Sequence, residues 1–179
     1  LIDYGSTENK PMAEAIGEFL KYASETLEPL GVNVSADIFG IVTTEEEDIG
    51  IGQHLETIAK NVDIISPMVY PSHYSMGSYG VMYPDSEPYK IIYKSLYTAK
   101  SRIEKIESKE KAAAIRPWLQ DFSAPWLKSQ YGSNYTPYGP KQIRQQIEAC
   151  HDCGIDEWMF WNGRNIYTID GFEVDTLNR

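Results

Sequence analysis

The stretch Asp63-Ile-Ile-Ser-Pro-Met-Val-Tyr-Pro-Ser-His-Tyr74 has a pattern that the rest of the chain repeats. Residues 64–70 are a short run of mainly β-branched and apolar side chains, which is typical of a buried strand. The run then changes to polar and aromatic residues at 71–74. Such a strand brings functional groups to the rim of a sheet or barrel, where loops bind ligands.

Three further segments read as strands of the same kind, and an amphipathic helix is expected before each of the four. The other strands are expected at residues 32–39, 112–122 and 156–162. Helices are expected from Met12, over residues 51–60, from Pro88 and from Pro140, because apolar residues recur at three and four positions and proline suits a first helical turn. Alternation of helix and strand predicts right-handed crossovers and a parallel sheet.

The loops give a more specific prediction of the fold. Those that follow the expected strands are long and aromatic, whereas those that precede them are short. This asymmetry is typical of a (β/α)8 barrel, whose active site lies at the carboxyl ends of the strands. A flavodoxin-like open sheet is the alternative, but no glycine-rich phosphate-binding turn follows the first strand.

Composition bounds the class of protein. The 179 residues suit one domain, with 42% hydrophobic residues, 13 tyrosines and four tryptophans. A net charge of −10 argues against a nucleic-acid partner and against an anionic membrane surface, while neutral ligands stay compatible. No apolar run approaches the roughly 18 residues of a membrane span, and no signal peptide begins at Leu1, so no membrane insertion is predicted.

The two cysteines, Cys150 and Cys153, are spaced like half of a zinc site or a redox motif. No second Cys/His pair accompanies them, and the motif closes a helix, whereas a thioredoxin-like motif opens one. A structural or incidental role is therefore favoured. Neither a metal nor a cofactor is predicted.

Four motifs carry a resemblance to a known family. They are residues 34–40 (Val-Ser-Ala-Asp-Ile-Phe-Gly), 65–74, 116–122 (Arg-Pro-Trp-Leu-Gln-Asp-Phe) and 154–162 (Gly-Ile-Asp-Glu-Trp-Met-Phe-Trp-Asn). In this order they resemble strands five to eight of a bacterial family of glycoside hydrolases with a (β/α)8 barrel. The resemblance implies that residues 1–179 form a single partial domain, the C-terminal half of a barrel that needs about 250 residues.

The resemblance is incomplete at the amino-terminal end. The family's fourth strand carries a motif of the type Phe-Asp-Tyr-(Val/Ile)-Arg-Phe-Pro, which Asp3 and Tyr4 match at only two positions. Residues 1–10 are therefore expected to be the loop before the first helix. Half a barrel leaves exposed sheet edges, which predict pairing with the missing N-terminal half or with a second copy as a homo-oligomer.

Two aspartates are the predicted catalytic residues. In a barrel strand, alternate side chains face the interior, which places Asp37 inward near the carboxyl end of its strand. The alternative for Asp37 is a structural ion pair with Arg116. Asp121 ends the third expected strand and either takes part in catalysis or caps the loop that follows.

The predicted substrate-binding residues lie at or near the same strand ends. Tyr70 and His73 can donate hydrogen bonds to sugar hydroxyls, and Trp161 can stack on a sugar ring while Asn162 anchors a hydroxyl. For Trp161 and Asn162 the alternative is simple barrel closure. The remaining candidates share one inward-facing register on the third strand: Arg116, Trp118 and Gln120.

The function that the resemblance implies is hydrolysis of a poly- or oligosaccharide. Glycosidases use two carboxyl groups, about 5 Å apart for retention and about 6.5–9.5 Å apart for inversion. Two alternatives stay open: a non-catalytic carbohydrate-binding or envelope-associated module, and an interaction module that dimerises through its sheet edges. An extracellular or envelope location is favoured over a cytoplasmic one.

Overall fold

The computed structural model describes residues 10–106 and 113–172, so the expected loop over residues 1–10 lies outside the described residues except for Lys10. The main elements, in chain order, are α1 (Met12–Leu27), β1 (Ser35–Phe39), α2 (Leu55–Ala59), β2 (Ile64–Met68), α3 (Pro88–Glu104), β3 (Ala114–Ile115), β4 (Trp118–Gln120), α4 (Lys128–Tyr131), α5 (Pro140–Asp152) and β5 (Met159–Trp161). The predicted alternation of helices with strands is confirmed.

The strands form one parallel sheet in the order β1-β2-β4-β5, with β3 paired to the start of β2. The third predicted strand is divided in two at Pro117. Arg116 N donates to the carbonyl of Ile65, but proline has no N–H with which to continue the ladder. Pairing with β2 then resumes at Trp118, which is opposite Met68.

The second predicted helix is shorter than expected. Residues 51–60 contain α2 only from Leu55, because Gly50 and Gly52 adopt φ values of 75° and 73°. That left-handed conformation belongs to turns and not to a helix interior. The helix then begins after His54, whose Nδ1 accepts a hydrogen bond from Thr57 N.

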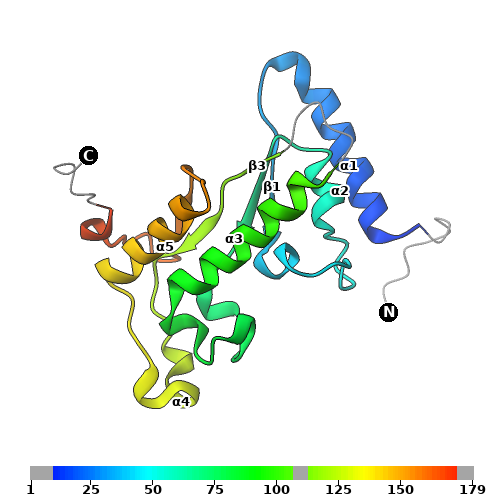
Figure 1. Ribbon diagram of the computed structural model, residues 1–179. Helices are drawn as coiled ribbons and strands as arrows, with labels where there is room; N and C mark the ends of the chain where they lie inside the picture. Colours follow the sequence, from blue (N-terminus) through cyan, green and yellow to red (C-terminus); the bar gives the residue numbers. More distant parts are fainter. Residues whose placement is uncertain (1–9, 107–112, 173–179) are drawn as a thin grey trace.

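Helices α2, α3 and α5 pack on one face of the sheet, and Figure 1 shows α3 crossing in front of the strands. Two buried clusters fill this interface, one around Ile38 and Ile65 and the other around Leu119 and Ile92. The residues of β1 that alternate with Ile38 are exposed on the opposite face; they are Ser35, Asp37 and Phe39. The predicted division of β1 into a helix side and an inward side is therefore confirmed.

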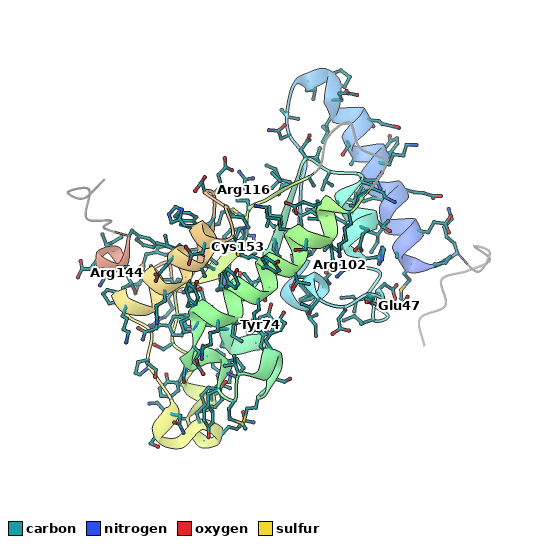
Figure 2. All side chains as sticks on the ribbon, viewed as in Figure 1. Glu47, Tyr74, Arg102, Arg116, Arg144 and Cys153 are labelled. Atoms are coloured by element: carbon teal, nitrogen blue, oxygen red, sulfur yellow. The ribbon has the colours of Figure 1, made fainter. Side chains whose placement is uncertain are left out.

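Arg102 on α3, which is labelled in Figure 2, ties the loop after β1 to the helix layer. Its guanidinium donates to both carboxylate oxygens of Glu56 at 2.7 Å. It also donates to the carbonyl oxygens of Val42 at 3.0 Å and of Glu45 at 2.7 Å. These charge-assisted bonds fix the start of the loop that follows Asp37.

Both cysteines are free thiols buried in the helix layer. Burial raises the pKa of the Cys150 thiol, and it raises that of Cys153 to about 11. Thiols of this kind are unreactive, in agreement with a structural role. In the described parts of the chain, no helix combines the length and the apolar character that crossing a membrane requires.

Gly40 allows the chain after β1 to pass close to the end of β2. A Cβ at this position would lie 2.5 Å from the carbonyl oxygen of Met68 and 2.7 Å from the hydroxyl of Tyr74. Gly40→Ala is expected to lower the free energy of unfolding by about 1–3 kcal/mol, measured by urea denaturation. Gly163→Ala is the control, because a Cβ there meets nothing within 4 Å. Equal effects of the two substitutions would contradict this account.

Candidate functional site

Asp37 lies on the exposed face of the sheet and contacts Trp118 of β4, which in turn contacts Trp161 of β5. Trp118 Nε1 donates a hydrogen bond of 3.0 Å to Asp37 Oδ1. The Trp118 ring meets that of Trp161 edge to face, with centroids 6.1 Å apart. Trp161 is exposed. The three strands β1, β4 and β5 therefore bring an accessible carboxylate and two indole rings together.

Tyr70 adds a phenol to this group from the end of β2. Burial, together with the negative charge of Asp37, raises the pKa of Tyr70 to about 12. The Tyr70 hydroxyl therefore keeps its proton at neutral pH and can act as a hydrogen-bond donor close to the carboxylate.

His73 and Phe122 extend the site away from Asp37. The Tyr70 ring lies 5.2 Å from that of His73 and 5.9 Å from that of Phe122, both in edge geometry. Burial lowers the pKa of the His73 imidazole. Since the unperturbed value is already about 6.5, His73 is neutral at pH 7 and can both donate and accept a hydrogen bond.

Gln120 is completely buried, and its side-chain amide connects two points of the loop between β2 and α3 to the loop after β4. Its Oε1 accepts from Ser72 N at 3.1 Å. Its Nε2 donates to Asp85 Oδ1 and to the carbonyl of Phe122, each at 2.9 Å. Gln120 therefore holds the segments that carry His73 and Phe122.

Asp121 and Asn162 anchor the loop that follows β5. Thr168 donates to both Asp121 carboxylate oxygens, from N at 2.8 Å and from Oγ1 at 2.7 Å. The Asn162 amide donates to the carbonyls of Asp121 and Ile166. Both residues are buried. These bonds occupy the Asp121 carboxylate with the loop after β5, and not with the loop that directly follows Asp121, which was the alternative considered for this residue.

Arg116 has another acidic partner than Asp37. It pairs with Glu157 at 3.7 Å, and the hydrogen bond to Asp37 comes from Trp118. An Arg116–Asp37 ion pair, the alternative considered for Asp37, is therefore not the contact that the structure shows. In the view of Figure 2, Arg116 and Tyr74 lie at opposite ends of the strands.

Asp85 is a buried residue at this end of the sheet that the sequence did not single out. It precedes α3 in the turn Pro84–Ser86 and is fully buried. Asp85 Oδ1 accepts the bond from Gln120, whereas Asp85 Oδ2 is one of four buried side-chain atoms of the described residues that have no hydrogen-bond partner; the others are Ser72 Oγ, Arg116 Nε and Tyr138 Oη. In the sequence, a Pro-Asp pair indicates only a turn. The sequence pattern therefore did not indicate that Asp85 would be buried and bonded to Gln120.

Ionisation of Asp85 is expected to oppose folding. Burial raises the pKa of its carboxyl from 3.8 to about 6, although the hydrogen bond from Gln120 acts to lower it. Since the folded state holds the proton more tightly, the stabilisation is complete below pH 3.8 and is lost as the pH rises through 6. Asp85→Asn should therefore be more stable than wild type at pH 8 but not at pH 3.5.

Unfolding by urea at the two pH values measures this effect. The exposed Asp170 provides the control, because Asp170→Asn should follow the wild-type pH dependence. An Asp85→Asn protein whose stability difference from wild type did not change between pH 3.5 and pH 8 would disprove the effect.

Residues 10–106 and 113–172 contain no group of three or more His, Cys, Asp or Glu side chains placed to hold a metal ion. The chemistry that the described residues offer consists of one exposed carboxylate, Asp37, with neutral hydrogen-bonding groups and aromatic rings around it. Such rings stack on the apolar faces of sugars, and the polar groups bind hydroxyls.

Comparison with known proteins assigns the chain to a family. Residues 1–167 match the family described as "Putative glycosyl hydrolase domain". None of the curated proteins matches the sequence.

Similar folds occur in solved structures. The spore cortex-lytic enzyme SleL of Bacillus cereus has a TM-score of 0.59 at 13% identity over 90% of this chain and 46% of its own. SleL of Bacillus megaterium QM B1551 has a TM-score of 0.57 at 13% identity, over 90% of this chain and 46% of its own. The PgaB (BpsB) glycoside hydrolase domain of Bordetella bronchiseptica has a TM-score of 0.47 at 14% identity, over 84% of this chain and 39% of its own.

The chain spans less than half the length of each of these structures. The likeness to the two SleL structures confirms the predicted α/β fold, with parallel (β/α) units that correspond to part of a barrel.

Proposed function

Because the chain belongs to the family described as "Putative glycosyl hydrolase domain", we propose that it is a glycoside hydrolase domain acting on a poly- or oligosaccharide with carboxylate acid–base chemistry. One observation carries the proposal: Asp37 is an exposed carboxylate that is held by Trp118 and lies among aromatic rings. A sugar ring stacked on Trp161 would present its glycosidic bond to that carboxylate.

Asp37 is the carboxyl group that we propose takes part in catalysis. Glycosidases use two such groups on either side of the scissile bond. The other predicted carboxylate, Asp121, has both oxygens bonded to Thr168. We therefore assign Asp121 a positioning role and expect the second catalytic carboxyl to come from another part of the barrel.

The rest of that barrel is proposed to pair with the free edges of β1 and β5. Among the described strands each of these two has a neighbour on one side only. The match to only 46% of each SleL structure supports the reading that the described strands are part of a barrel. A second copy of the chain is the alternative partner at these edges.

The remaining site residues are proposed to bind or to position the sugar. Tyr70 and His73 present neutral hydrogen-bonding groups, and Trp118 and Trp161 present rings. Gln120 and Asn162 act through the loops that they hold. Arg116 lies just before β4 and pairs with Glu157. It would contact only a part of the substrate that extends past the tryptophans toward the start of that strand.

A non-catalytic carbohydrate-binding module is the second candidate function. One observation favours it: of the two predicted catalytic carboxylates, only Asp37 is exposed. Such a module would use the same aromatic rings to bind sugar without cleaving it.

Release of reducing ends from a panel of polysaccharides tests the proposal, with the gene product that contains this sequence as the enzyme. Hydrolysis of at least one polysaccharide is expected. Binding of a glycan without any release of reducing ends would instead support the non-catalytic module. If no glycan were either bound or cleaved, both candidate functions would be wrong.

A further inference from the structure

A row of aromatic rings leads from Asp37 to the surface. Tyr70 lies next to Phe122, and Phe122 lies next to Trp126 with ring centroids 6.3 Å apart and planes tilted by 31°. Trp126 is 57% exposed. The row therefore begins at a buried ring beside the carboxylate and ends at an indole in solvent.

The backbone on both sides of Trp126 is held in place. Ala124 and Leu127 are buried in a small cluster with Tyr131, and Leu127 N donates to the carbonyl of Ala124 at 3.0 Å. The carbonyl of Phe122 accepts from Gln120 Nε2. The exposed indole is thus presented by a fixed turn, so ordering it on binding costs little conformational entropy.

We propose that Trp126 forms a distal sugar subsite and that the site recognises an extended neutral oligosaccharide rather than a single terminal sugar. This inference rests on the proposed function. One pyranose ring covers one aromatic ring, so the partly exposed Phe122 and the exposed Trp126, in addition to Trp161, correspond to several consecutive sugars, while the buried Tyr70 ring supports Phe122 from beneath. A single sugar bound at Asp37 would leave Trp126 in solvent.

The charges near the row select neutral sugars. His73, whose ring lies 6.4 Å from that of Phe122, is neutral at pH 7 because burial lowers its pKa. Asp37 at the inner end carries a negative charge, and the chain as a whole has a net charge of −10. An acidic polysaccharide would be repelled both locally and at long range.

Isothermal titration calorimetry with hexamers and dimers of β-1,4-linked glucose and of β-1,4-linked N-acetylglucosamine tests the proposal. Trp126→Ala is expected to weaken binding of the better hexamer about 10-fold and to leave dimer binding unchanged, because one stacking contact is lost. Trp126→Tyr should retain most of the hexamer affinity. Tyr97→Ala is the matched control, because Tyr97 is also 57% exposed but lies on α3 in the helix layer.

The outcomes separate this inference from the proposed function. Equal losses for hexamer and dimer, or no change for either, would overturn the distal subsite even if the gene product hydrolyses glycans. Tighter binding of an acidic hexamer, such as α-1,4-linked galacturonate, would overturn the preference for neutral sugars. If neither neutral hexamer bound to wild type, the inference would fail, and the release of reducing ends would decide separately whether the proposed function survives.

Discussion

Replacement of Asp37 by asparagine is expected to lower the rate of glycan hydrolysis by about 10²–10⁴-fold and to change the free energy of unfolding by less than about 0.5 kcal/mol. Asparagine has the same shape, and its Oδ1 can still accept the bond from Trp118 Nε1 that Asp37 accepts at 3.0 Å. Because position 37 is exposed, no buried group loses a partner. What the substitution removes is the ability to carry a charge or transfer a proton.

Initial rates of reducing-end release from the best polysaccharide, together with urea denaturation, measure the two parts of this prediction. Asp156→Asn is the control, because Asp156 is exposed and bonds to His151 ahead of β5. Trp118→Phe should give a smaller loss of rate, since it removes the hydrogen bond that orients the carboxylate and reduces the ring that meets Trp161 but keeps the carboxylate itself. An Asp37→Asn enzyme with a rate within threefold of wild type would remove Asp37 from the mechanism.

The sequence predicted those parts of the fold that depend on local periodicity. Ile38 alternates with Asp37, and this period of two was enough to place one in the helix layer and the other on the open face. Periodicity could not locate the break at Pro117 within an apolar run, nor the late start of α2. Both depend on the backbone: the strand breaks because Pro117 has no N–H, and α2 begins late because Gly52 adopts a positive φ.

The candidate site was predictable only in part, because strand ends are visible in a sequence and contacts between distant loops are not. Asp37, Tyr70 and Trp161 were identified from their places on strands. Thr168 is 47 residues from Asp121, and nothing in the sequence indicates that it bonds to both carboxylate oxygens. Trp126 was part of a loop recognised as aromatic, but its alignment with Phe122 needed the fold.

The buried amide of Gln120 is where a substitution should cost the most stability. Gln120→Leu is expected to lower the free energy of unfolding by about 3–5 kcal/mol, because it removes three hydrogen bonds and leaves Ser72 N, Asp85 Oδ1 and the Phe122 carbonyl without this partner. Leucine is of similar size, so the loss reports the hydrogen bonds and not a cavity. Urea denaturation at pH 7 measures it, and Gln130→Leu on the surface of α4 is the control.

A second substitution separates the hydrogen bonds of Gln120 from its shape. Gln120→Glu keeps the acceptor for Ser72 N but loses both donor contacts and places a second carboxyl group against Asp85 Oδ1. Since the pKa of Asp85 is about 6, the two groups repel at pH 8, whereas at pH 5 a proton can lie between them. The stability lost by Gln120→Glu should therefore be smaller at pH 5 than at pH 8. Gln120→Leu should show a smaller change in the same direction, because it removes the bond that stabilises the Asp85 carboxylate but adds no second charge. A loss below about 1 kcal/mol for Gln120→Leu would show that the two loops are held by other contacts.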